Sequence, residues 1–157
     1  MITFAGSTAL DSLELRLLHC KLVASVAATA HALGVYVGDA MLVRNAADYV
    51  AEARIASRDV LPTMLWIGFN PVNDSGMLSA YTTGLTAFGL PELEVHQSTR
   101  PAAELLGTMA DAASYELRTG RILGDGETFG FGESERIPVR HTRSSFLRDM
   151  MVALLGL

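Results

Sequence analysis

The residues most able to take part in metal binding or proton transfer are Glu92, Glu94 and His96. They alternate with Leu93 and Val95 along one short stretch. Side chains two positions apart on a β-strand point to the same side of the sheet. Two carboxylates and an imidazole on one side are groups that ligate metals or transfer protons. The competing interpretation is the solvated side of an antiparallel strand. We therefore treat the three polar residues as candidate ligand-binding residues and keep both interpretations.

Three further candidates for ligand contact are Asp39, Trp66 and Tyr81, each within or beside an apolar stretch. An aromatic ring with a polar tip is useful for recognising a ligand. Such residues are also typical of the edge of a core, where the N–H or O–H finds an internal partner. The sequence alone leaves both roles open for these residues.

Basic residues gather toward the C-terminal end of the chain. They are Arg136, Arg140, His141, Arg143 and Arg148. Together with Ser144, which we expect to open a helix, Arg140, His141 and Arg143 are candidates for binding a phosphate or carboxylate. The alternative is a solvated surface that pairs with the acidic residues Glu133 and Glu135.

Several familiar chemistries are excluded by residues that the chain lacks. Cys20 is the only cysteine, which excludes an internal disulfide and a CxxC site, and we expect it to be a buried structural thiol. The glycines between 120 and 132 do not lead into a helix, and no lysine follows in the Walker position, so they predict turns. The motifs HExxH and GxSxG are absent. We expect no metal and no cofactor.

The composition is that of a soluble globular domain. Half of the 157 residues are hydrophobic and the net charge is −5. Nucleic acids and anionic membranes attract basic surfaces, so neither is an expected partner. The N-terminus lacks the pattern of a signal peptide, and the most apolar stretch, residues 22–37, is shorter than the roughly 20 residues of a membrane span. We expect one cytoplasmic domain over residues 1–157.

The elements that position these residues follow from apolar spacing and from glycine and proline. Strands are predicted at 2–5, 35–37, 64–69, 77–85, 92–96, 128–131 and 137–139. Helices are predicted to begin near residues 11, 45, 101 and 144. The turn formers of 73–76 predict a hairpin between the third and fourth strands. The mixture favours an α+β fold, a mixed and largely antiparallel sheet packed by about three to four helices.

The expected helices are assigned core-facing stripes by their apolar spacing. The stripe of the first helix is Leu15, Leu18, Leu22, Val26 and Ala30. The stripe of the third is Leu105, Met109, Ala112 and Ala113. The last helix carries adaptable apolar side chains, which predict either docking on the sheet or a homo-oligomer interface. The interface candidates are Met150, Met151, Leu154 and Leu155.

Three stretches taken together resemble a known family. They are residues 33–40 (LGVYVGDA), residues 79–85 (SAYTTGL) continuing through 88–95 (FGLPELEV), and residues 124–128 (GDGET) continuing through 137–141 (IPVRH) to Ser144. Over nearly the whole chain the sequence resembles the bacterial family called domain of unknown function 4261. The resemblance implies a shared fold and no particular activity. Members often carry a further N-terminal segment, which we expect this chain to lack, and many have tryptophan where this chain has Val37.

The expected function is a non-enzymatic interaction or adaptor domain in the cytoplasm that self-associates. This expectation combines the missing catalytic motifs with apolar surface at both ends of the chain. The alternative is a small-molecule-binding protein or a hydrolase-like enzyme that uses Glu92, Glu94 and His96. That alternative requires the three side chains to converge at a cleft.

Overall fold

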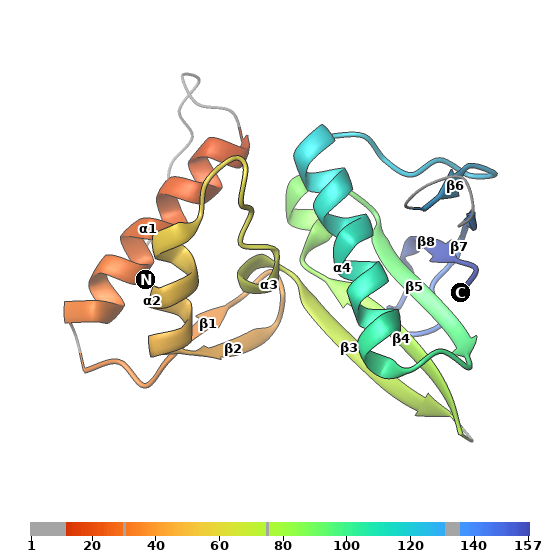
Figure 1. The fold of residues 1–157 in the computed structure, drawn as a ribbon, viewed down its shortest axis with the longest axis horizontal. Coiled ribbons are helices and arrows are strands. Elements are labelled where there is room, and N and C mark those ends of the chain that lie inside the picture. The colour runs from red at the N-terminus through yellow and green to blue at the C-terminus, as the bar shows by residue number, and fades with distance from the viewer. Residues whose placement is uncertain (1–11, 30, 75, 131–135) are drawn as a thin grey trace.

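The computed structural model describes residues 12–29, 31–74, 76–130 and 136–157. Figure 1 shows two parts side by side. The N-terminal part, residues 12–66, contains α1 (Ser12–Thr29), β1 (Gly34–Val37), β2 (Leu42–Asn45), α2 (Ala46–Ile55) and α3 (Thr63–Trp66). Strands β1 and β2 form a two-stranded antiparallel sheet next to α2. The short helix α3 leads into the second part.

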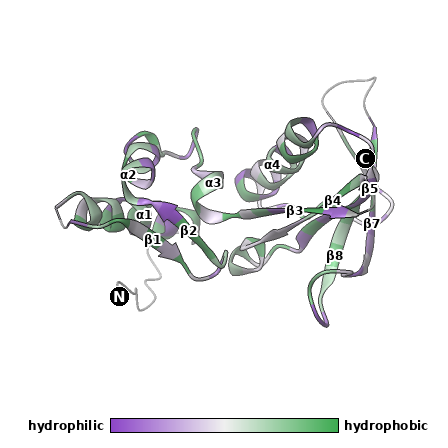
Figure 2. Cartoon of the chain, turned by 90° about the horizontal axis from the view of Figure 1, so that it is seen from below, coloured by the Kyte–Doolittle hydropathy of each residue, from purple (hydrophilic) through white to green (hydrophobic). Residues whose placement is uncertain are grey.

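The second part is a six-stranded sheet with one long helix on it. Its strands are β3 (Gly68–Asp74), β4 (Met77–Thr83), β5 (Glu92–Ser98), β6 (Thr128–Phe129), β7 (Ile137–Arg143) and β8 (Met151–Leu155). Their order is β3-β4-β5-β8-β7-β6, and β5 and β8 are the one parallel pair among these described strands. Helix α4 (Ala102–Thr119) lies along one face of the sheet, and the 3₁₀ helix η1 (Leu85–Phe88) links β4 to β5 (Figures 1 and 2). The predicted α+β fold with a mixed, largely antiparallel sheet is confirmed.

Most predicted elements are present, and local contacts explain where they begin and end. Asn45 caps α2, since its Oδ1 accepts hydrogen bonds from the backbone of Ala47 at 2.8 Å and Asp48 at 3.4 Å. Gly120 ends α4 with a φ of 66°, the left-handed conformation that glycine tolerates. The predicted hairpin joins β3 to β4 with Asp74 opposite Met77. The strand expected at residues 2–5 lies outside the described residues.

Two predicted elements are wrong. Residues 64–69 do not form one strand, because Thr63–Trp66 is a helical turn with Leu65 N bonded to Pro62 O, and β3 begins at Gly68. The predicted last helix is also wrong. Met151–Leu155 is the strand β8, which lies between β5 and β7 in the sheet. A short apolar run suits a buried strand and a buried helix equally, so its spacing could not separate the two.

The core-facing side of α1 is also different from the prediction. Leu17, Cys20 and Ala24 are buried, while Leu18, Leu22 and Val26 are 42, 40 and 53% exposed. The buried side is the one with smaller residues, which lets α1 approach Tyr49 and Ala53 of α2 closely. For α4 the prediction is confirmed, because Leu105, Met109, Ala112 and Ala113 are all fully buried.

One cluster of buried apolar residues runs through both parts of the molecule. It contains Leu17 and Tyr49 from the N-terminal part together with Leu93, Met109 and Val139 from the second. The predicted single domain over 1–157 is compatible with this continuity and stays a prediction. In the described ranges, no helix is long and apolar enough to cross a membrane.

Candidate functional site

Glu92 opens β5 with its carboxylate turned back into the protein, where only 2% of the residue is exposed. Its Oε1 accepts hydrogen bonds from Gly84 N at 2.8 Å, Thr86 N at 3.1 Å and Thr86 Oγ1 at 3.2 Å. Its Oε2 accepts one from Thr82 Oγ1 at 2.7 Å. Because four donors surround this carboxylate, it satisfies the polar groups at the start of η1. The position of Glu92 is that of a structural side chain.

Glu94 is fully buried in the middle of the same strand. His96 Nε2 lies 2.8 Å from Glu94 Oε2, and the Ser144 hydroxyl donates to Glu94 Oε1. The backbone N–H of Ser145 donates to Glu94 Oε2 at 3.2 Å. Ser144 Oγ in turn accepts from Leu147 N at 2.6 Å. Glu94 thus holds the connection between β7 and β8 against the sheet.

An aromatic ring packs against two neighbours of this carboxylate, Tyr81 and His96. Phe146, in the β7–β8 connection, stacks on Tyr81 with ring centroids 5.2 Å apart and meets the His96 ring edge-on at 5.7 Å. Tyr81 stands directly opposite Glu94 in the β4–β5 pairing. Tyr81, Glu94, His96, Ser144 and Phe146 therefore form one cluster, which we call the Glu94 cluster.

The structure brings together only part of the predicted acidic and histidine set. Glu94 and His96 touch, whereas Glu92 turns toward η1 and bonds to different partners. Both carboxylates are buried, so the interpretation as a fully solvated strand face does not fit. His96 keeps about a third of its side chain exposed, and it is the one member of the three that solvent can reach.

Trp66 and Asp39 lie away from the Glu94 cluster. Trp66 is buried and packs on Phe88 with ring centroids 5.4 Å apart. Asp39 forms an exposed ion pair with Arg16 at 2.8 Å, and the Arg16 guanidinium lies 4.9 Å from the centre of the Phe88 ring. These residues connect the N-terminal part to η1, a role that packing explains without a ligand.

Two of the predicted anion-binding residues, Ser144 and His141, bond to different parts of the protein. Ser144 donates to a carboxylate, which repels an anion. His141 Nε2 lies 2.7 Å from Leu123 O, and its backbone N–H donates to Asp125 at 2.8 Å. Arg140 and Arg143 are exposed on β7. A shared anion site for Arg140, His141, Arg143 and Ser144 stays a prediction without support from this arrangement.

Glu116 of α4 is a functional candidate that the sequence reasoning missed. It is fully buried, its Oε1 accepts from Leu123 N at 2.8 Å, and its Oε2 has no hydrogen-bond partner in the described part of the chain. Burial raises the pKa of its carboxyl to about 7. The sequence held a signal, because Glu116 continues the spacing of Leu105, Met109 and Ala112 along the buried stripe.

Buried polar groups in this part of the molecule thus hold loops. Glu92 holds η1, Glu94 holds the β7–β8 connection, and Glu116 holds the segment at Leu123. Within the ranges that the structure describes, no group of three or more His, Cys, Asp or Glu side chains is arranged to bind a metal ion. The Cys20 thiol is buried, as expected, and burial raises its pKa, which disfavours a reactive thiolate.

Comparison with known proteins identifies one region of the chain. Residues 81–154, slightly less than half of the 157-residue sequence, match the model of a family described as domain of unknown function (DUF4261). No curated protein and no solved structure matches the chain. The matched segment runs from Tyr81 in β4 to Leu154 in β8 and includes the whole Glu94 cluster, whereas the resembling stretch 33–40 lies outside it. Through residues 81–154 the chain is therefore similar to the DUF4261 family, the same family that its sequence resembles.

Proposed function

We propose that the chain is a non-enzymatic interaction module that associates with a second copy of itself through the outer side of α1. The observation that carries this proposal is the distribution of exposed apolar side chains. Thirteen large ones are exposed among the described residues, and ten of them lie between Leu18 and Met64. Isolated exposed apolar residues are ordinary, but a concentration of them in one part of a molecule is typical of an interaction surface.

Leu18, Leu22 and Val26 are the most regular group in that distribution. Their spacing of four residues places them in one row along α1, which we call the α1 stripe. Helix α1 has 18 residues and is therefore roughly 27 Å long. The α1 stripe itself runs from Leu18 to Val26 and is therefore roughly 12 Å long. A row of apolar side chains on one helix is self-complementary, because two copies related by a twofold axis can pack ridge into groove. A second copy is thus the partner that this surface fits.

This proposal moves the interface away from the C-terminal residues. Val152, Ala153 and Leu155 are buried inside the sheet as part of β8, and Met151 is the exposed large apolar residue of that strand. An interface on a C-terminal helix is not available, since those residues form a strand. We also propose a bacterial and cytoplasmic setting, which rests on the family resemblance and on the single, buried cysteine.

Light scattering coupled to size exclusion tests the proposal. Leu22→Glu places a charge in the α1 stripe, and Met151→Glu is the matched control on exposed apolar surface elsewhere. We expect the wild-type chain and Met151→Glu to have the mass of a dimer, and Leu22→Glu to have that of a monomer. A monomeric wild-type chain at concentrations up to the millimolar range would disprove self-association. Loss of the dimer in Met151→Glu alone would move the interface back to the C-terminal residues.

The alternative proposal, a small-molecule-binding protein or hydrolase-like enzyme at Glu92, Glu94 and His96, has less support. Both oxygens of each carboxylate already accept hydrogen bonds from the protein. A ligand at this position would have to replace those bonds, and each buried donor left unsatisfied costs roughly 1–3 kcal/mol. His96 remains the one accessible group of the three.

A further inference from the structure

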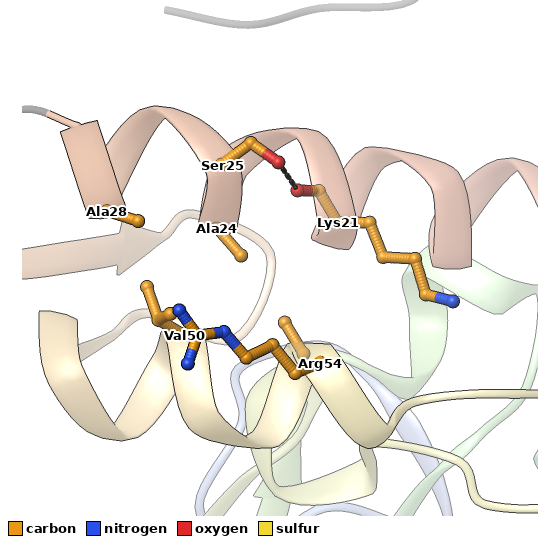
Figure 3. Close-up of a pocket in the computed structure, with 7 residues that line it drawn as sticks. Lys21, Ala24, Ser25, Ala28, Val50 and Arg54 are labelled. Atoms are coloured by element: carbon orange, nitrogen blue, oxygen red, sulfur yellow. Dashed lines mark hydrogen bonds between the residues drawn. The ribbon is translucent and has the colours of Figure 1, made fainter.

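A groove lies between α1 and α2. Its volume is about 290 Å³, and it is lined by Lys21, Ala24, Ser25, Ala28, Val50, Ala53 and Arg54 (Figure 3). Three of these residues are alanines, and their small side chains leave the space that larger residues would fill. Pockets for drug-sized ligands measure roughly 300–1,000 Å³, so this groove suits a smaller molecule.

The charged groups at this groove are all positive. Lys21, the only lysine of the chain, comes from α1, and Arg54 comes from α2. No acidic side chain lines the groove, although the chain as a whole carries a net charge of −5. In the described residues neither cation has an ion-pair partner, whereas Arg16 and Arg58 of the same part of the molecule each pair with a carboxylate.

The arrangement of these groups indicates the chemical class of ligand that the groove could bind. Figure 3 shows the Arg54 guanidinium below α1 and the Lys21 ammonium nearer the other end of the groove, with Ala24, Ala28 and Val50 between the two helices. The Ser25 hydroxyl donates to Lys21 O at 2.8 Å and so is already satisfied. An apolar floor with a cation toward each end fits a molecule with a hydrocarbon body and a negative head group.

We infer that this groove binds a small organic carboxylate with a short hydrocarbon chain. The carboxylate forms a charge-assisted hydrogen bond with Arg54 or Lys21, and the chain lies on Ala24, Ala28 and Val50. This site is separate from the α1 stripe, because Lys21, Ala24 and Ala28 lie on the side of α1 that faces α2. The inference therefore does not depend on self-association.

Nuclear magnetic resonance titration of the full-length chain with hexanoate tests this inference. We expect saturable shifts of the amides of α1 and α2 around the groove. 1-Hexanol, which has the same chain and no charge, should bind roughly tenfold more weakly or worse, because it cannot form a charge-assisted hydrogen bond. Acetate, which has the charge and almost no chain, should produce no saturable shift.

Matched variants identify the site. The double variant Lys21→Gln/Arg54→Gln should weaken hexanoate roughly tenfold or more, and Ala28→Leu should abolish binding by filling the groove. Arg118→Gln, at an exposed arginine of α4, is the charge control and should leave binding unchanged. The altered residues, Lys21, Ala28, Arg54 and Arg118, are all exposed, so a folded spectrum is expected for each variant. Absence of saturable hexanoate binding, or equal affinity in the double variant and Arg118→Gln, would overturn the inference.

Discussion

Helices α1 and α4 have the same length, 18 residues, yet they are used in opposite ways. In α4 the apolar residues form one stripe that packs on the sheet, and polar residues cover the other side. In α1 apolar residues lie on all sides, and the stripe of larger ones faces solvent. An exposed row of large apolar side chains on a helix is typical of a surface that further protein covers. The difference indicates that α1 has a second surface to bury.

The two parts of the molecule also differ in whether their charged side chains are buried or exposed. In the sheet part, Glu92, Glu94 and Glu116 are buried and bonded to loops, so their carboxylates maintain the fold. In the N-terminal part, cations and apolar side chains are presented to solvent around α1. We therefore expect substitutions of the buried carboxylates in the sheet part to change stability, and substitutions of the exposed residues around α1 to change binding.

The largest expected effect on stability is at Glu92. Glu92→Ala leaves the backbone N–H groups of Gly84 and Thr86 without their acceptor in a buried environment. We expect the free energy of unfolding to fall by about 4 kcal/mol, since each unsatisfied donor costs roughly 1–3 kcal/mol. Urea denaturation measures this change. Glu104→Ala, at an exposed acidic residue of α4, should cost less than about 0.5 kcal/mol. Equal costs at the two positions would contradict a structural role for Glu92.

A slightly smaller effect is expected from the ionisation of Glu116. The pKa of this carboxyl is raised to about 7 in the folded protein by burial, against 4.5 for an ordinary glutamate. The contribution of the neutral Glu116 carboxyl to the free energy of unfolding is therefore full below about pH 4.5. It is lost as the pH rises through about 7, and above that pH it no longer changes. Over that window the difference in unfolding free energy between wild type and Glu116→Gln should change by about 3 kcal/mol. A difference independent of pH would show that Glu116 ionises as freely as in the unfolded chain.

An intermediate effect separates the two sides of α1. Leu17→Ala should cost about 2 kcal/mol, because it opens a cavity in the buried apolar cluster. Leu22→Ala should cost less than about 0.5 kcal/mol in the dissociated chain, because Leu22 is 40% exposed. Thermal and chemical unfolding at low protein concentration compare the two. The reverse ranking would mean that the core faces the stripe first expected from the sequence.

The smallest effect is expected at His96. His96→Ala removes one hydrogen bond from Glu94, which retains its bonds from Ser144 and Ser145. We expect a loss below about 1 kcal/mol, since the histidine is partly exposed. Chemical denaturation near neutral pH is the measurement. A loss of unfolding free energy as large as that of Glu92→Ala would show that His96 stabilises the Glu94 cluster more than a partly exposed residue should.

Much of the fold could be predicted from local signals in the sequence. Asn45, the turn at 73–76, Gly120 and the alternation of β5 each act over a few residues, and each marks a real boundary or strand. The predictions that were wrong concern features that depend on residues far away in the sequence. Residues 151–155 are a strand because β5 and β7 lie on both sides of them. Packing against Tyr49 and Ala53 of α2 determines which side of α1 is buried, and the spacing of residues within α1 does not show this.

The candidate site was predicted less well than the fold, for a related reason. Alternation along β5 correctly put Glu94 and His96 near each other, but alternation does not show where a carboxylate turns at the end of a strand. Glu92 turns toward η1 because Gly84 and Thr86 offer donors there. Ser144 reaches Glu94 through the β7–β8 connection, 50 residues away in sequence. Only the folded sheet makes that contact visible.

Hydroxyl-radical labelling at low and high protein concentration tests the central claim most directly, because it measures exposure of individual side chains. Leu22 of α1 is 40% exposed and Ile122, beyond α4, is 43% exposed, so the two aliphatic residues form a matched pair. We predict that labelling of Leu22 falls as the concentration rises through the dimerisation range, while labelling of Ile122 stays constant. Equal labelling of Leu22 at all concentrations up to the millimolar range would contradict the proposed interface on α1.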